Sequence, residues 1–243
     1  MFDIPRDRIL QVKHIDVRLM DEPHPYELAN LDAINANWAE EVARLPKLFD
    51  GEMILLAHAT YRDGVVEGAC HPIRFATFMH WRKNRAASHG HHVFANAVPV
   101  TSDGQLLAIR MGPDTANAGR VYFAAGSFER QDFVGGVADV DYNIHREVAE
   151  ETGIDLATVK RDDSFYAYRS AAGLTLIRRY YLAEDAAASA RRVQAFIDAE
   201  PEPEADRAVI IGGSEDVPDT APAHMKPLVQ WHFSSNVAAT RES

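Results

Sequence analysis

The chain has 243 residues, of which 47% are hydrophobic and 25% charged, the composition of a soluble globular protein that can bury one substantial core. Its net charge of −11 argues against broad nucleic-acid binding, and any anionic substrate would need local positive charge. A single cysteine, Cys70, excludes an internal disulfide, and no apolar run approaches the roughly 18 residues that span a bilayer. We therefore expect a cytoplasmic protein without a membrane partner.

The first third of the chain predicts an α+β unit. Partial alternation of apolar and polar residues over 9–20 favours a strand. A helix is expected over residues 25–45, where apolar side chains recur at threes and fours: Leu28, Leu31, Ile34, Trp38, Val42 and Leu45. Asp63-Gly64 predicts a hairpin turn after a strand at 53–61, and His71-Pro72 is expected to open a short aromatic helix that ends at Arg82.

The polar stretch 83–92 is the expected boundary between an N-terminal extension, residues 1–88, and a second domain, residues 89–243. It contains three histidines that could suggest a metal site: His89, His91 and His92. Because no patterned partner accompanies them, we interpret them as solvated. The extension is expected either to cap a functional site or to build a homodimer.

The second domain is expected to begin with a β-hairpin. Strands at 93–100 and 105–111 flank Ser102-Asp103-Gly104, the clearest hairpin signal in the chain. Arg110, near the end of the second strand, could contact a phosphate. A short strand at 121–123 then leads into a loop that contains Gly126.

A helix is predicted around the sequence R-E-V-A-E-E-T-G-I, residues 146–154. It is expected to begin at Asp139 or Asp141 and to carry an apolar stripe at Val140, Ile144 and Val148. Glu147, Glu150 and Glu151 stand at i, i+3 and i+4, which places three carboxylates on one side of a helix. Like charges at this spacing cost a helix roughly a few tenths of a kcal/mol per pair, and a bound cation would reverse that cost. Hard oxygen ligands suit Mg²⁺ or Mn²⁺ rather than zinc. Gly153 is expected to end the helix in a left-handed conformation.

This stretch resembles the second half of the Nudix box, G-x5-E-x7-R-E-U-x-E-E-x-G-U, the signature of hydrolases that cleave nucleoside diphosphates linked to another moiety. The residues that meet the pattern are Arg146, Glu147, Val148, Glu150, Glu151, Gly153 and Ile154. The first half of the box does not match the pattern, because counting back from Arg146 puts Ala138 at the glutamate position and Asp132 at the glycine position. We interpret Gly126 as a displaced glycine and Glu129 as the acidic residue that follows it, before an apparent insertion.

The resemblance implies a Nudix-type α/β/α sandwich with a mixed β-sheet over roughly residues 90–240. It also implies that Glu147, Glu150 and Glu151 bind Mg²⁺ or Mn²⁺, with the carbonyl of Gly126 as a further ligand. Arg146 would orient Glu147 by an ion pair. The implied partner is a small nucleoside diphosphate compound, such as a nucleotide sugar or a dinucleotide. Arg110 and Glu129 are the expected contacts with this substrate.

The C-terminal third predicts two strands, at 165–168 and 174–182, a helix at 184–199, a strand at 209–211 and a closing helix at 222–233. Arg178 and Arg179 should lie on opposite faces of the second strand. Related hydrolases often bring a further carboxylate to the metal from a late loop, for which Glu202 and Glu204 are the candidates. The alternative is an acidic linker.

Three other functions are possible alternatives for a chain with these motifs. A non-catalytic Nudix-like ligand-binding or regulatory module would keep the fold without the chemistry. An isopentenyl diphosphate isomerase is suggested only by Cys70-His71-Pro72, without the rest of its pattern. A Ser/His hydrolase has no support, because no G-x-S-x-G occurs.

Overall fold

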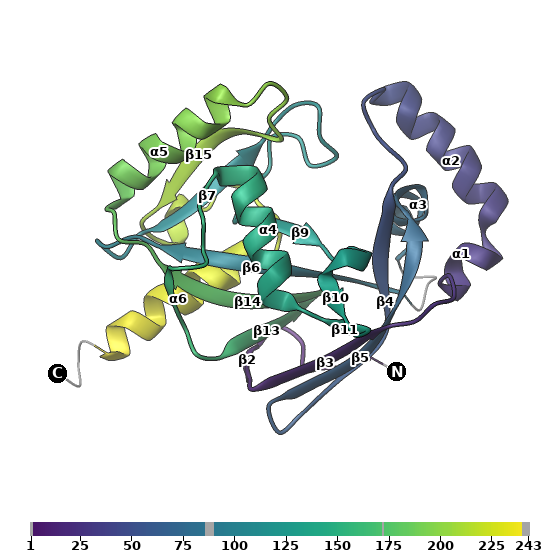
Figure 1. The fold of residues 1–243 in the computed structure, drawn as a ribbon, viewed down its shortest axis with the longest axis horizontal. Helices are drawn as coiled ribbons and strands as arrows, with labels where there is room; N and C mark the ends of the chain where they lie inside the picture. Colours follow the sequence, from purple (N-terminus) through teal and green to yellow (C-terminus); the bar gives the residue numbers. More distant parts are fainter. Residues whose placement is uncertain (1, 86–89, 172, 240–243) are drawn as a thin grey trace.

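The computed structural model describes residues 2–85, 90–171 and 173–239, and Figure 1 shows how their elements are arranged. The helices are α1 Pro25–Ala29, α2 Leu31–Arg44, α3 Phe75–Lys83, α4 Val140–Thr152, α5 Ala186–Ala199 and α6 Met225–Ala239. The strands are β1 Phe2–Asp3, β2 Ile9–Val12, β3 His14–Leu19, β4 Glu52–Arg62, β5 Val65–Arg74, β6 His91–Val100, β7 Leu106–Met111, β8 Val121–Tyr122, β9 Ala125–Ser127, β10 Phe133–Val134, β11 Val137–Ala138, β12 Lys160–Arg161, β13 Phe165–Ser170, β14 Gly173–Tyr181 and β15 Ala205–Ile211.

A mixed β-sheet runs through the molecule, with β6 at its centre. Strand β6 is parallel to β14 and antiparallel to β4, β7 and β9. The main path of the sheet is β10-β11-β3-β5-β4-β6-β14-β13-β2, and β15 extends it beyond β7. The sheet therefore joins strands of the N-terminal 88 residues to strands of the remainder. The expected domain boundary between residues 88 and 89 itself lies outside the described residues.

Helices cover both faces of the sheet, as two neighbouring arginines of β14 show. Arg178 reaches α4, where its Nη1 lies 2.7 Å from Asp141 Oδ2. Arg179 points the other way, and its guanidinium lies 4.2 Å from the ring centroid of Trp231 on α6. Successive strand residues face opposite sides of a sheet, so α4 and α6 lie on opposite faces. The predicted α/β/α layering and the opposite faces of Arg178 and Arg179 are confirmed.

The extension forms its own cluster of helices at one end of the sheet, where α1, α2 and α3 gather beside β4 and β5 (Figure 1). Trp38 packs edge-on against Phe75, with ring centroids 6.1 Å apart, beside a small second core. Trp38 is half-buried and packs against this core rather than lying inside it. No helix in the described parts of the chain is long and apolar enough to cross a membrane.

Two predictions for the extension are wrong. The expected helix over 25–45 is broken at Asn30, whose side-chain amide donates to the carbonyl of Tyr26 and competes with the helical backbone. The predicted helix start at His71-Pro72 is also wrong, because β5 continues to Arg74 in register with β4. Helix α3 begins only afterwards, where Asp50 Oδ1 accepts a hydrogen bond from the amide of Ala76 at 2.8 Å. Tertiary pairing here overrides local sequence.

Helix α4 begins and ends where the sequence predicts. Asp139 is the N-cap, and its Oδ1 accepts a hydrogen bond from the amide of Tyr142 at 3.0 Å. The predicted apolar stripe of α4 is buried in the main core: Val140, Ile144 and Val148. Gly153 follows with φ 68°, and Ile154 folds back into the core. The helix is therefore fixed at both ends, so its acidic side has a defined orientation.

Replacing Gly153 with Val should lower stability by about 2–4 kcal/mol. The left-handed backbone is strained for a β-branched residue, and a Cβ at this position would overlap the ring of Phe196 on α5. Urea unfolding of the two proteins would measure the loss. An unchanged midpoint would contradict the helix end described above.

Buried His224, just before α6, should make the protein less stable in acid. Burial lowers its pKa to about 4, and the nearby Arg120 contributes. The unfolded state, with a pKa of about 6.5, therefore takes up a proton that the folded state does not, and stability falls as the pH drops below about 6.5. Between pH 7.5 and pH 5, wild type should lose about 2 kcal/mol relative to His224→Gln, which has no titrating group there. A gap in unfolding free energy that stays constant with pH would contradict this.

Candidate active site

The three carboxylates predicted on α4 occupy different environments. Glu151 is buried, and its Oε2 accepts a hydrogen bond from the amide of Ala125 at 3.0 Å. Glu147 lies against the backbone of Gly126, so closely that a Cβ on that glycine would overlap the carboxylate. The side chain of Glu150 is 60% exposed. The first two thus fasten α4 to strand β9, and the third faces solvent.

Arg146 lies at the centre of an ion-pair network on this side of α4. Its Nη1 is 2.8 Å from Glu147 Oε1 and 3.2 Å from Glu150 Oε2. Its Nη2 is 3.1 Å from Asp132 Oδ2, and Glu129 lies at the edge of the network, 3.9 Å from Nη1. Burial lowers the pKa of Arg146, but Asp132, Glu147 and Glu129 outweigh it and raise the pKa above its ordinary value. The guanidinium therefore stays charged and fixes the Glu147 carboxylate.

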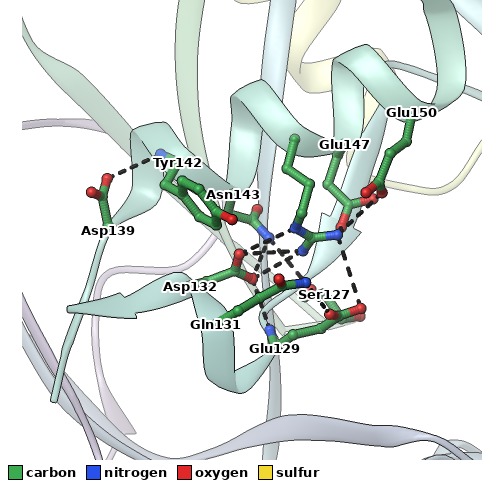
Figure 2. Close-up of polar contacts among 10 residues, drawn as sticks. Ser127, Glu129, Gln131, Asp132, Asp139, Tyr142, Asn143, Glu147 and Glu150 are labelled. Atoms are coloured by element: carbon green, nitrogen blue, oxygen red, sulfur yellow. Dashed lines mark hydrogen bonds and ion pairs between the residues drawn. The ribbon is translucent and has the colours of Figure 1, made fainter.

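Asp132 is a member of this network that the sequence analysis missed. It is fully buried, and it accepts hydrogen bonds from the Asn143 side chain and the Glu129 amide, both at 2.8 Å (Figure 2). Five residues separate Gly126 from Asp132, the same spacing as the G-x5-E part of the pattern. Counting back from Arg146 had placed Asp132 at the glycine position. That count is wrong because the additional residues lie between Asp132 and α4. The preserved spacing from Gly126 was the available signal.

The additional residues form the hairpin β10–β11. Thirteen residues lie between Asp132 and Arg146, where the pattern has seven. Gly135 and Gly136 form the turn with φ of 59° and 80°, a two-residue connection that favours glycine at both positions. Val137 pairs with Arg18 of β3, and the Leu19 amide donates to the Gly136 carbonyl at 2.9 Å. The hairpin therefore ties the loop before α4 to the N-terminal extension.

The two buried carboxylates of α4 resist ionisation. Desolvation raises the pKa of Glu147 to about 8, with Glu150 adding to the rise and Arg146 opposing it. Burial raises the pKa of Glu151 well above its ordinary value, and the Glu147 charge raises it further. Desolvation also raises the pKa of Glu204, with a contribution from Glu150. Positive charge placed among these groups would stabilise their ionised forms.

A cavity of about 820 Å³ opens beside these groups. Its walls include most of the predicted site residues: Gly126, Glu129, Arg146, Glu147, Glu150, Glu151, Glu202 and Glu204. Glu202 and Glu204 line it from the loop before β15. The structure thus brings the late acidic loop and the acidic helix side to one cavity, although some 50 residues separate them in sequence.

Arg110 lies apart from this group. Its Nε and Nη2 bind both carboxylate oxygens of Asp206 at 2.7 and 2.9 Å, and it does not line the cavity. Arg178 and Arg179 are likewise held by other acids, Asp141 and Asp162. Substrate binding by Arg110 stays a prediction, and Asp206 would have to release its guanidinium for it.

His91, His92 and Cys70 take structural positions. His89 lies outside the described residues, and His91 stacks on Phe2 with ring centroids 3.7 Å apart. His92 hydrogen-bonds Ser127 Oγ at 2.8 Å, and burial lowers its pKa to about 3. Cys70 is fully buried, which raises its thiol pKa and makes it unreactive. In the described ranges, no three His, Cys, Asp or Glu side chains are already arranged around a metal position.

No protein-family model matches the chain, and a comparison with curated proteins finds no relative. Similar solved structures include the MutT protein from Methanosarcina mazei Go1, 16% identical over 60% of this chain and 95% of that one, with a TM-score of 0.41. A NUDIX hydrolase from Nitrosomonas europaea is 18% identical over 61% and 90%, with a TM-score of 0.39. An Ap4A hydrolase from C. elegans is 14% identical over 61% and 98%, with a TM-score of 0.38. Similarity at this level does not decide an activity, which must rest on the residues of the site.

Proposed function

We propose that this chain is a divalent-cation-dependent hydrolase that cleaves the pyrophosphate of a nucleoside diphosphate linked to another moiety. One observation carries the proposal: the two halves of the Nudix-like pattern, separated by an inserted hairpin in sequence, meet in space. Asp132 binds Arg146 of α4, while Glu147 packs on Gly126. In a charge-rich surface helix, these acids would be exposed to solvent rather than packed against a loop that contains a glycine.

The acids on α4 fit a hard divalent cation such as Mg²⁺ or Mn²⁺. The donors are carboxylate oxygens, with the Gly126 backbone at the same place, and none of the described residues that line the cavity is a cysteine or a histidine. Glu147 raises the pKa of buried Glu151, and Glu150 raises the pKa of Glu147, so a cation would remove an electrostatic cost that the protein otherwise bears. We propose Glu147, Glu150 and Glu151 as its ligands.

Pyrophosphate hydrolysis requires that charge on non-bridging oxygens be neutralised and that a water be held in line with the leaving group. A bound divalent cation supplies the neutralisation and lowers the pKa of bound water. Arg146 holds the Glu147 carboxylate in a fixed orientation, and Asp132 holds Arg146. Glu202 and Glu204 line the same cavity as the acids of α4, where either could accept a proton from water. The raised pKa of Glu204 favours it for this role.

A panel of nucleoside diphosphate compounds tests the proposal. The purified chain should release a nucleoside monophosphate from at least one nucleotide sugar or dinucleotide with Mg²⁺, and EDTA should abolish the release. The non-catalytic alternative predicts ligand binding without turnover. It would be favoured if calorimetric titration with Mg²⁺ gave no heat and every compound in the panel stayed intact.

A further inference from the structure

A second cavity, of about 190 Å³, adjoins the carboxylate cavity. The two share part of their walls, including Tyr122, Ala125, Gly126 and Ser127. We name the smaller one the arginine pocket, after three of its lining residues: Arg82, Arg85 and Arg120. A ligand that lies over Gly126 can therefore contact the acids of α4 on one side and enter the arginine pocket on the other.

The arginine pocket concentrates positive charge in an acidic protein. Among the described residues, no Asp or Glu lines it. Burial lowers the pKa of Arg82, and the Arg120 and Arg85 charges lower it further. Guanidiniums that line one small pocket repel one another, and an anion among them would relieve the repulsion. The pocket is therefore suited to a phosphate.

A buried amide faces the same pocket with no hydrogen-bond partner among the described residues. Asn96 on β6 is fully buried, and neither its Nδ2 nor its Oδ1 is satisfied. Leaving such a group unpaired costs roughly 1–3 kcal/mol, so a complementary ligand would recover that energy. A side-chain amide offers one donor and one acceptor side by side, which match the edge of a nucleobase.

The remaining wall is aromatic. The ring of His92 lies between Phe78 and Phe94, with centroids 4.7 Å from each, and His224 lies 5.1 Å beyond Phe94. Stacking of a base on such rings is worth about 1–3 kcal/mol. A planar ring suits this wall better than a sugar, whose hydroxyl groups would find no carboxylate acceptor among the described lining residues.

We propose that the arginine pocket binds the nucleotide end of the substrate. The base packs on the aromatic wall with its edge on Asn96, and the adjoining phosphate lies among Arg82, Arg85 and Arg120. The other moiety then extends into the larger cavity. This assignment rests on the proposed pyrophosphohydrolase function for its orientation, but nucleotide binding by the pocket can be measured without hydrolysis.

Calorimetric titration in the absence of divalent metal tests the pocket with AMP, GMP, CMP and UMP, and with ribose 5-phosphate and inorganic phosphate as probes. At least one nucleotide should bind about tenfold or more tightly than ribose 5-phosphate, because the stacking and base-edge contacts are lost without the base. Arg120→Gln should weaken nucleotide binding by about tenfold through loss of a charge-assisted contact. Arg62→Gln, an exposed arginine on β4 outside both cavities, should leave the affinity unchanged.

Asn96→Asp keeps the shape of the side chain but replaces the amide donor with an acceptor. It should change the order of preference among the four nucleotides, whereas a merely structural effect would weaken all of them alike. Equal affinity for ribose 5-phosphate and nucleotides, or an unchanged affinity in Arg120→Gln, would overturn the pocket assignment. So would the absence of nucleotide binding by a protein whose thermal unfolding is normal. If nucleotides bind but no pyrophosphate compound is cleaved, the pocket stands and the proposed hydrolysis fails.

Discussion

Glu151→Gln is expected to reduce turnover by roughly 10³-fold while leaving the protein at least as stable as wild type. A neutral amide is a poor ligand for Mg²⁺. A bound cation stabilises the transition state by several kcal/mol. Because about 1.4 kcal/mol corresponds to a tenfold change in rate, loss of the cation gives a decrease of this size. The burial that raises the pKa of Glu151 destabilises its charged form, and glutamine removes that cost. The glutamine oxygen can still accept the hydrogen bond from the amide of Ala125.

Glu150→Gln separates the effect on turnover from the effect on stability. This side chain is largely exposed, so its replacement should leave the melting temperature unchanged and still reduce turnover. Glu67→Gln, an exposed carboxylate on β5 outside the cavity, is the matched control and should behave as wild type in both measurements. Steady-state kinetics with the substrate found in the panel, at saturating Mg²⁺, and thermal unfolding provide the readouts. Retained turnover in both Glu150→Gln and Glu151→Gln would refute the metal-ligand assignment.

Gly126→Ala is expected to reduce turnover by on the order of 10²-fold without unfolding the protein. The new methyl group would overlap the Glu147 carboxylate, which is the movable end of a side chain and can turn away. The backbone of Gly126 is outside the left-handed region, so alanine adds no strain there. A displacement of about 1 Å at a catalytic group can cost about 10²-fold in rate.

A matched glycine variant shows whether the effect belongs to the site. Gly212→Ala, in the loop after β15, brings a methyl group into ordinary or slightly tight contact with Asp216 and Gln105 and should keep full activity. Mg²⁺ titration of Gly126→Ala should also show weaker metal binding, since the turned Glu147 leaves the cation. Wild-type kinetics in Gly126→Ala would mean that the close packing of Glu147 on this glycine has no catalytic purpose.

The sequence by itself determined helix α4 and its acidic side. Residues three and four apart lie on one face of a helix, so the carboxylates at 147, 150 and 151 and the stripe through Ile144 follow from local spacing alone. The N-cap at Asp139 and the left-handed end at Gly153 are also local, because each depends on hydrogen bonds within one turn. These features needed no knowledge of the rest of the chain.

Only the tertiary structure decided which distant residues join that helix. Asp132 pairs with Arg146 because hairpin β10–β11, which pairs with β3, takes up the additional residues between them, an arrangement that counting back from Arg146 cannot show. The arginine pocket likewise assembles α3, β6 and the segments around Arg120 and His224, which no sequence period connects. Local patterns are set by backbone geometry over a few residues, whereas contacts between distant segments depend on how the sheet and its helices pack. The acidic helix and the Arg146–Glu147 ion pair could thus be predicted from the sequence, whereas the position of Asp132 in the network and the two cavities could not.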